Sequence, residues 1–323
     1  MRSEMACLLA LTALTACKGN PTDSSGGAAA TLYDGPLLYA PAQEWSAFRF
    51  QDRPVRAYIP PDPVGMVWMF HGTNGNISMC HQIEPIATIN ELVLAGIGFA
   101  CSESLAQGQG NQWDDGTAPD DNPDVAFLDA LHDELVATTP LTDDTPQFTL
   151  GFSAGGGMAG FYADYLISKG YEVPAVAPHN SNGYGFELVE AGFIYILPEN
   201  DPQGRSTAEA SVEGRTAAGF RTEILTPPEV PLNEAFFGRD PNLQENTIRN
   251  TLRELERLEL IDEAGHRLFD IDDHEDMIRY FENNAEVPSP TNRTEQMRVG
   301  WATHRLNGIY ARDVRDFFLD HLE

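Results

Sequence analysis

Residues 148–157 are Phe-Thr-Leu-Gly-Phe-Ser-Ala-Gly-Gly-Gly, and the central pentapeptide Gly151-Phe152-Ser153-Ala154-Gly155 fits the pattern G-x-S-x-G. In this pattern a serine occupies a sharp turn from a strand into a helix, with a strained backbone. A β-prone run at 147–150 precedes the serine, and a run of small residues at 158–163 follows it. Side chains in place of the two flanking glycines would collide with the turn. A plain Gly/Ser loop would not need these flanks, so the stretch predicts a strand, a serine and then a helix.

The rest of the chain alternates between strand-like and helix-like stretches, which predicts an α/β fold with a mostly parallel sheet and helices on both faces. At 323 residues, one extended domain spanning 37–323 accounts for the pattern. Strands are expected at 45–50, 55–59, 65–70, 98–101, 147–150, 175–177, 193–197 and 222–225. Helices are expected at 83–95, at 124–137, from the serine turn to 169, and at 246–260, 274–281 and 310–322.

The charge of the chain is strongly negative, with 49 acidic against 20 basic residues and a formal net charge of −29. A nucleic acid is therefore excluded as an expected partner, because its phosphates would be repelled. The acids are scattered along the chain, which indicates a solvated acidic surface. The composition says nothing of the oligomeric state.

The first residues have the character of an export signal. An apolar run at 6–16, too short to span a membrane, precedes Cys17. Leu14-Thr15-Ala16-Cys17 resembles the lipobox of bacterial lipoproteins, which implies a signal peptide at 1–17 and an acylated Cys17 that anchors the protein to a membrane. The alternative is a conventional cleaved signal, and Met5 is a possible start; either signal would export the protein. Residues 18–36 are expected to form a flexible tether.

Removal of the signal would leave two cysteines, Cys80 and Cys101, in the mature domain. In an oxidising compartment these two are expected to form a disulfide, and two buried thiols are the alternative. Their spacing does not suit a zinc site, and neither H-E-x-x-H nor a Cys-His cluster occurs. No metal and no other cofactor is expected.

An apolar strand at 65–70 leads directly into His71-Gly72-Thr73. Attack by a serine needs two backbone N–H groups directed at the oxygen that becomes negative. We expect Ala154 to supply one amide and Thr73 the other, with Asn74 as the nearest alternative. His71 is expected to support the loop structurally.

An activated serine also needs a base and a carboxylate, and behind this kind of turn they follow in the order serine, acid, histidine. The apolar strand at 193–197 ends close to Asp201, which is our candidate, and Glu199 is the rival. His304 is the candidate base because it lies in a loop just before the last helix. The other histidines in this part of the chain lie in charged helical stretches or in the final helix: His266, His274 and His321.

With these motifs in order, the chain resembles an α/β-hydrolase of the secreted esterase group that includes polyhydroxybutyrate depolymerases, feruloyl esterases and acetylxylan esterases. The similar portion covers about residues 45–225 and the last ~25 residues. Supporting motifs are the segment around Trp113 and Asp124-Val125-Ala126-Phe127. The resemblance implies a triad of Ser153, Asp201 and His304 and acyl transfer to water.

Residues 227–298 depart from that pattern as an insertion before His304. A strong amphipathic helix at 246–260 and a second helix at 274–281 predict a helical cap. A lid over the site is the functional interpretation, and a structural appendage is the alternative. Residues 288–293 are expected to form the loop that returns to the body.

The predicted function is therefore an exported serine esterase, acting on a small or polymeric ester. Two alternatives remain open at the level of sequence. One is a serine peptidase of the same fold, and the other is a lipid-anchored binding protein with an inactive site.

Overall fold

The fold was examined in a computed structural model, which describes residues 33, 35–105, 112–183, 189–286 and 291–322. The predicted signal peptide at 1–17, the acylation site Cys17 and nearly all of the tether at 18–36 lie outside these residues. Within the described residues, no helix combines the length and the apolar character needed to cross a bilayer.

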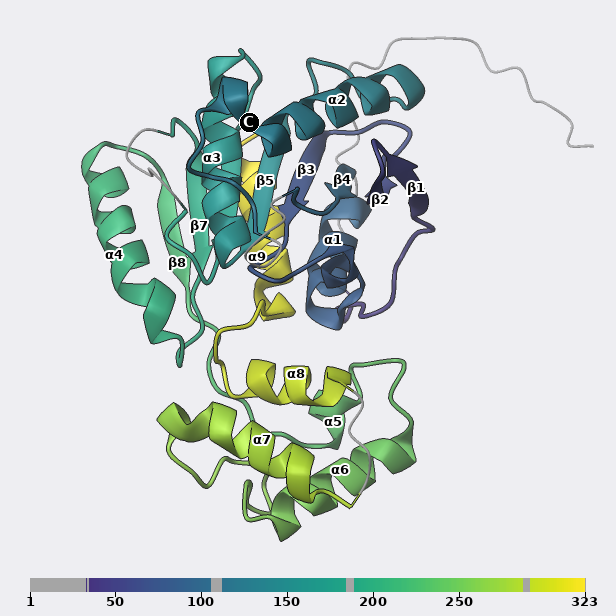
Figure 1. The fold of residues 1–323 in the computed structure, drawn as a ribbon, viewed down its shortest axis with the longest axis vertical. Coiled ribbons are helices and arrows are strands. Elements are labelled where there is room, and N and C mark those ends of the chain that lie inside the picture. The colour runs from purple at the N-terminus through teal and green to yellow at the C-terminus, as the bar shows by residue number, and fades with distance from the viewer. Residues whose placement is uncertain (1–32, 34, 106–111, 184–188, 287–290, 323) are drawn as a thin grey trace, which may run out of the picture. The chain divides into compact units, whose positions relative to one another are not determined.

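The centre of the molecule is a sheet with the strand order β1-β2-β4-β3-β5-β6-β7-β8 (Figure 1). The first two strands and the β2–β4 pair are antiparallel, and all later pairs are parallel. The predicted strands are confirmed. Their bounds are β1 (Ser46–Phe50), β2 (Arg53–Tyr58), β3 (Gly65–Phe70), β4 (Ile97–Cys101), β5 (Gln147–Phe152), β6 (Ala175–His179), β7 (Gly192–Ile196) and β8 (Thr222–Leu225).

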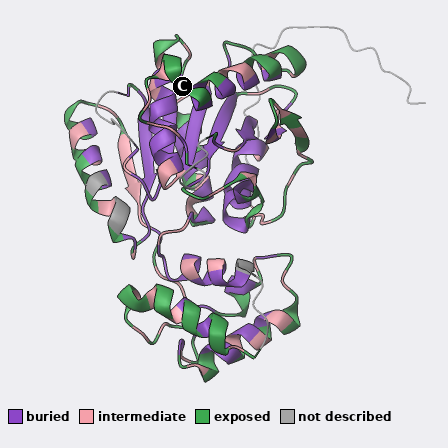
Figure 2. Cartoon of the chain, viewed as in Figure 1, coloured by how far each residue is buried: buried purple, intermediate pink, exposed green. Residues whose placement is uncertain are grey.

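Helices cover both faces of the sheet, and the middle strands are buried throughout because they are packed from both sides (Figure 2). Alternate residues of β3 show the division: Trp68 packs on the face covered by α2 and α3, whereas Val67 packs on the face covered by α1 and α9. The bounds are α1 (Ile83–Leu94), α2 (Pro123–Thr138), α3 (Ala154–Ser168), α4 (Pro202–Ala217) and α9 (Ala311–Asp320). This arrangement, with a serine turn after β5, is the predicted α/β-hydrolase fold.

Between β8 and α9 lie helices α5 (Glu234–Phe237), α6 (Glu245–Arg257), α7 (His274–Asn284) and α8 (Thr291–Gly300), grouped together in Figure 1. We call residues 227–300 the cap. They share an apolar cluster of their own, in which Leu255, Ile278, Phe281 and Met297 are almost fully buried.

One expectation for the cap is wrong. Of the loop expected at 288–293, residues 288–290 lie outside the described residues, and residues 291–293 belong to the helix α8 and not to a loop. The sequence hides this helix because much of its buried face is polar. Arg293, Thr294 and Gln296 are buried, and Arg293 donates to the hydroxyl of Thr251. Without an apolar stripe there is no helical periodicity to recognise.

Candidate active site

Ser153 lies between the end of β5 and the start of α3, with φ 53° and ψ −121°. A positive φ is strained for a residue with a side chain, and such strain is typical of functional turns. A main-chain hydrogen bond ties the turn to the end of β6, because the Ser153 amide donates to the His179 carbonyl at 2.9 Å. A Cβ at Gly151 or Gly155 would overlap neighbouring main chain, so the glycines are required sterically.

His304 follows the cap in the loop before α9, and its ring contacts the other two candidate residues. Nε2 of His304 lies 2.9 Å from Oγ of Ser153, and Nδ1 lies 2.8 Å from Oδ2 of Asp201. The structure thus brings together the three residues that the sequence nominated. A serine, an imidazole and a carboxylate in this order are arranged for proton transfer from the hydroxyl.

Asp201 follows β7, immediately before α4, and is only 1% exposed. The rival carboxylate, Glu199, has another partner: its Oε2 accepts a hydrogen bond from the amide of Glu229 at 3.2 Å. Asn200, between Glu199 and Asp201, joins the loop after β7 (the acid loop, 197–201) to the loop before α9 (the histidine loop, 301–307). Its amide donates to the Ala302 carbonyl at 3.0 Å, and its side chain donates to the Trp301 carbonyl at 2.8 Å. These two hydrogen bonds from Asn200 therefore join the segment that carries Asp201 to the segment that carries His304.

One residue of the site escaped the sequence analysis. Asn180 follows β6, is 3% exposed, and donates its Nδ2 to Oδ2 of Asp201 at 2.7 Å. It adopts φ 54°, a conformation that asparagine tolerates better than most residues. The available signal was its position directly after an apolar strand, the same argument that singled out Asp201.

The loop after β3 is a tight turn beside the serine. The Gly75 amide donates to the Gly72 carbonyl at 2.9 Å, and Asn74 adopts φ 60°. Within the described residues, we find no hydrogen bond donated by the amide of Thr73 or of Ala154. Ala154 is the first residue of α3, where helix amides have no partner inside the helix.

His71 is buried beside this loop, and its Nε2 accepts the Ser104 amide at 3.1 Å. Burial lowers the pKa of His71, so the ring is neutral and able to accept that hydrogen bond. His179, at the end of β6, is also fully buried, and desolvation lowers its pKa to about 3. Neither ring contacts the hydroxyl of Ser153 in the hydrogen bonds of the described residues.

The remaining candidate histidines lie elsewhere. His266 is exposed in the cap beside Asp262, and His274 begins α7, where it contacts Glu275. His321 ends α9, and its Nδ1 lies 2.7 Å from the Phe317 carbonyl.

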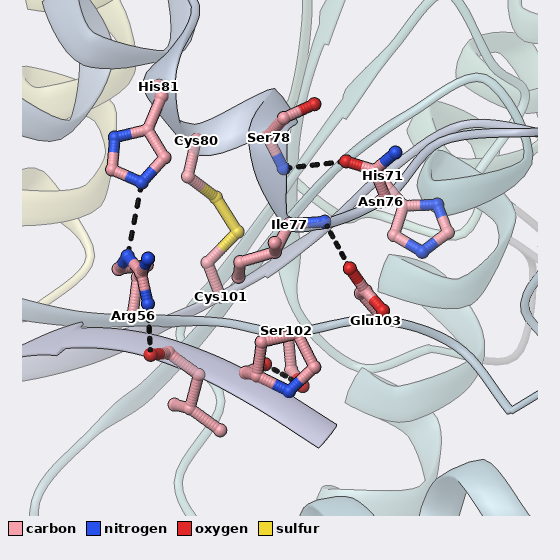
Figure 3. The surroundings of a disulfide bond; sticks show 12 residues. Arg56, His71, Asn76, Ile77, Ser78, Cys80, His81, Cys101, Ser102 and Glu103 are labelled. Carbon is pink, nitrogen blue, oxygen red and sulfur yellow. Dashed lines mark hydrogen bonds between the residues drawn. A yellow bond between two sulfur atoms is a disulfide. The ribbon is translucent and has the colours of Figure 1, made fainter. Parts of the chain in front are cut away.

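Cys80 and Cys101 form the predicted disulfide (Figure 3). Cys80 lies in the 3-10 helix η1 (Ile77–His81), which follows the loop after β3, and Cys101 ends β4. Oε1 of Glu103 accepts the Ile77 amide at 3.2 Å, next to the disulfide. These contacts fasten the segment after the Thr73 loop to the end of β4.

Within the described residues, no group of three or more His, Cys, Asp or Glu side chains is arranged to hold a metal ion.

No protein-family model matches the sequence, and no curated protein matches it. Among solved structures, the chain is similar to an arylesterase (TM-score 0.43, 16% identity, covering 66% of this chain and 85% of that chain). It is also similar to dienelactone hydrolase from Anabaena variabilis ATCC 29413 (TM-score 0.42, 18% identity, 59% and 87%) and to Pyrococcus horikoshii acylaminoacyl peptidase (TM-score 0.44, 12% identity, 71% and 43%). At this distance the likenesses assign no reaction to the chain, and the site must be interpreted from its own geometry.

Proposed function

We propose that this chain is a serine hydrolase that cleaves carboxylic esters through an acyl-enzyme on Ser153. The observation that supports the proposal best is the continuous hydrogen-bonded series from Ser153 through His304 to Asp201. The strained turn of Ser153 at the start of a helix is a second, independent support. A serine with an ordinary structural role would need neither feature.

The chemistry follows from the contacts. His304 takes the proton of Ser153 through Nε2 as Oγ attacks the ester carbonyl. The carboxylate of Asp201 holds the Nδ1 proton and stabilises the imidazolium. The amides of Thr73 and Ala154 would hold the developing oxyanion. The imidazolium of His304 gives its proton to the alkoxy oxygen as the ester C–O bond breaks, so the alcohol leaves and the acyl group stays on Ser153. His304 then takes a proton from water as the water attacks the acyl-enzyme, and it returns that proton to Oγ of Ser153 as the acid leaves.

The test is hydrolysis of p-nitrophenyl acetate and butyrate by residues 37–323 with and without Ser153→Ala. We expect the substitution to lower kcat by at least about a thousand-fold. Ser168→Ala is the matched control, because Ser168 lies at the far end of α3 and only donates to the Tyr165 carbonyl. Equal activity in Ser153→Ala and the parent would refute the proposal.

Two further assays separate the alternatives. Peptide p-nitroanilides assayed beside the esters distinguish a peptidase from an esterase. Labelling of the parent with a fluorophosphonate, and its loss in Ser153→Ala, distinguishes an active site from an inactive binding protein, since only an activated serine reacts.

We also infer export with a lipid anchor at Cys17. The support is the sequence motif at 14–17 and a disulfide in the folded domain, which is typical of oxidising compartments. Expression of the full chain in a bacterial host, with Cys17→Ser as the variant, should show loss of radiolabelled fatty acid and release from the membrane fraction. Equal labelling of both proteins would contradict the inference.

A further inference from the structure

A cavity of ≈370 Å³ lies between the body and the cap. One wall is formed by η1 and the first residues of α1, and the other by α8 and the loop after His304. Its apolar lining consists of Met79, Ile83, Phe152, Val299 and Leu306. Pockets for small ligands commonly measure roughly 300–1,000 Å³ and are mostly apolar. The cavity is therefore of a size to hold a short or medium acyl chain.

Phe152 separates this cavity from the serine. Of the described residues that line the cavity, Phe152 directly precedes Ser153 and Arg305 directly follows His304, but neither Ser153 nor His304 is among them. The Phe152 ring lies 5.3 Å from the His304 ring, centroid to centroid. On its other side it lies against Gly72, where an added Cβ would be 2.8 Å from Cδ1 of the ring. The ring thus fills the space where the Thr73 loop, His304 and the cavity meet.

Among the charged residues of the lining, carboxylates outnumber cations. Glu84, Asp240 and Glu295 line the cavity. Glu295 is paired with Arg305, and Asp240 accepts the side-chain amide of Gln296 at 3.2 Å. Burial raises the pKa of Glu84 beside Arg239. A lining with more carboxylates than cations disfavours an anionic chain end, so the cavity suits a neutral chain.

We propose that Phe152 is a specificity-determining residue, which closes the cavity to the acyl chain and restricts the enzyme to esters of short acids. This inference rests on the proposed function. We assign the cavity to the acyl side because the Phe152 ring lies against the loop that would hold the carbonyl oxygen. The ring also lies near His304, beside which the alcohol would leave, so the experiment must separate the acyl side from the alcohol side. Removal of the ring joins the cavity to the site and admits a longer neutral acyl chain.

The experiment measures kcat/KM for p-nitrophenyl acetate, butyrate, hexanoate and octanoate with the parent, Phe152→Ala and Phe152→Leu. We expect the octanoate-to-acetate ratio to rise at least about tenfold in Phe152→Ala, since each additional methylene in an apolar pocket changes the rate about ten- to two-hundred-fold. Phe152→Leu should give an intermediate ratio. The ratio does not depend on how much the substitution weakens the site as a whole.

Three controls test whether the change in the octanoate-to-acetate ratio comes from opening the cavity. Phe50→Ala makes the same change at a half-buried phenylalanine of β1, packed on Phe127, and should leave the ratio unchanged. Val299→Phe, added to Phe152→Ala, refills the cavity from α8 and should reverse the gain with octanoate. A p-nitrophenyl monoester of adipic acid should be a poorer substrate of Phe152→Ala than the hexanoate, because its chain ends in a carboxylate.

The outcomes separate the inference from the function on which it rests. A parent that cleaves acetate, with Phe152→Ala slower on all four esters by one factor, would show that the ring only supports the turn, and the inference would fail alone. Ethyl acetate and octyl acetate, assayed beside the p-nitrophenyl esters, vary the alcohol instead of the acid. A gain of Phe152→Ala with octyl acetate and none with octanoate would also overturn the inference, because the cavity would then take the alcohol. A parent that neither cleaves esters nor reacts with a fluorophosphonate overturns both.

Discussion

The body and the cap position their residues in different ways. In the body, Ser153 and Asp201 follow the parallel strands β5 and β7, and main-chain hydrogen bonds hold the loops around them. In the cap, short helices surround their own apolar cluster, and ion pairs such as Arg267–Glu229 and Arg298–Glu275 lie around it. On the proposed function, the main chain of the sheet positions the reacting residues, whereas side-chain contacts hold the cap together. Changes next to Ser153 and Asp201 should then alter kcat, changes in the cap should alter stability, and selectivity should depend on Phe152, which lines the cavity between the two regions.

The largest expected effect is in the body. Asp201→Asn should lower kcat by about ten thousand-fold, because an amide favours the wrong tautomer of His304. Glu199→Gln is the matched control two residues away, where the side chain accepts only the Glu229 amide in the hydrogen bonds of the described residues. Steady-state kinetics with p-nitrophenyl butyrate measures both. Comparable losses in the two variants would mean that the acid loop acts as a whole and that Asp201 has no special role.

Asp201 and Glu199 also show which parts of the site can be predicted from the sequence and which cannot. Ser153 and Thr73 could be proposed from the sequence because their signals are local: a strand, a turn and a small residue. Asp201 and Glu199 could not be separated, because the choice depends on Asn200 contacting residues 301 and 302, about a hundred positions away. Asn180 was missed because its only local mark is its place after a strand.

The fold was predictable for the same reason, since buried parallel strands have a continuous apolar pattern. The helix α8 was not, because its buried polar residues Arg293 and Gln296 contact Thr251 and Asp240 of other cap segments, and a local pattern does not encode such contacts. The cavity beside Phe152 is likewise formed by segments more than two hundred residues apart, and no local pattern encodes it.

The next largest effect is expected where cap and body meet. Arg239 of the cap pairs with the fully buried Glu84 of α1 at 3.0 Å. Arg239→Met should lower the free energy of unfolding by roughly 3–4 kcal/mol at pH 7, because it leaves a buried carboxylate without its cation. Arg221→Met removes two exposed ion pairs, with Glu223 and with Asp320, and should cost about 1 kcal/mol or less.

The pH dependence gives this prediction a sign. Burial already raises the pKa of Glu84, and loss of Arg239 raises it further. A group with a raised folded-state pKa contributes stability that is present below its unfolded pKa and is lost as the pH rises through the folded pKa. The cost of Arg239→Met should therefore shrink between pH 7 and pH 5, as measured by urea unfolding. A cost that stays constant across this range would contradict a buried, ionised partner.

A similar effect on stability is expected from the disulfide that fastens η1 to β4. Cys80 and Cys101 are 21 positions apart, and both are buried. Replacing both by Ala should lower the free energy of unfolding by about 3 kcal/mol, through the greater freedom of the unfolded chain. Reductant should lower the unfolding midpoint of the parent and leave that of the double variant unchanged. If reductant, added while the parent is unfolded, leaves its unfolding midpoint unchanged, the disulfide does not form.

The smallest effect is expected in the body, at Asn180, whose side chain donates a hydrogen bond to Asp201. Asn180→Gly keeps the positive φ of 54° but removes the hydrogen bond to Asp201, so kcat should fall about ten- to a hundred-fold with little change in KM. Asn180→Ala removes the same bond and adds backbone strain of about 1–2 kcal/mol, which should appear in urea unfolding and not in kcat. If the loss of kcat follows the loss of stability across the two variants, Asn180 only supports the loop after β6. If both variants lose kcat equally and only Asn180→Ala loses stability, the side-chain amide of Asn180 positions Asp201. The second pattern would extend the contrast with the cap to the residues behind Asp201, because the hydrogen bond of Asn180 would then act on kcat and not on stability.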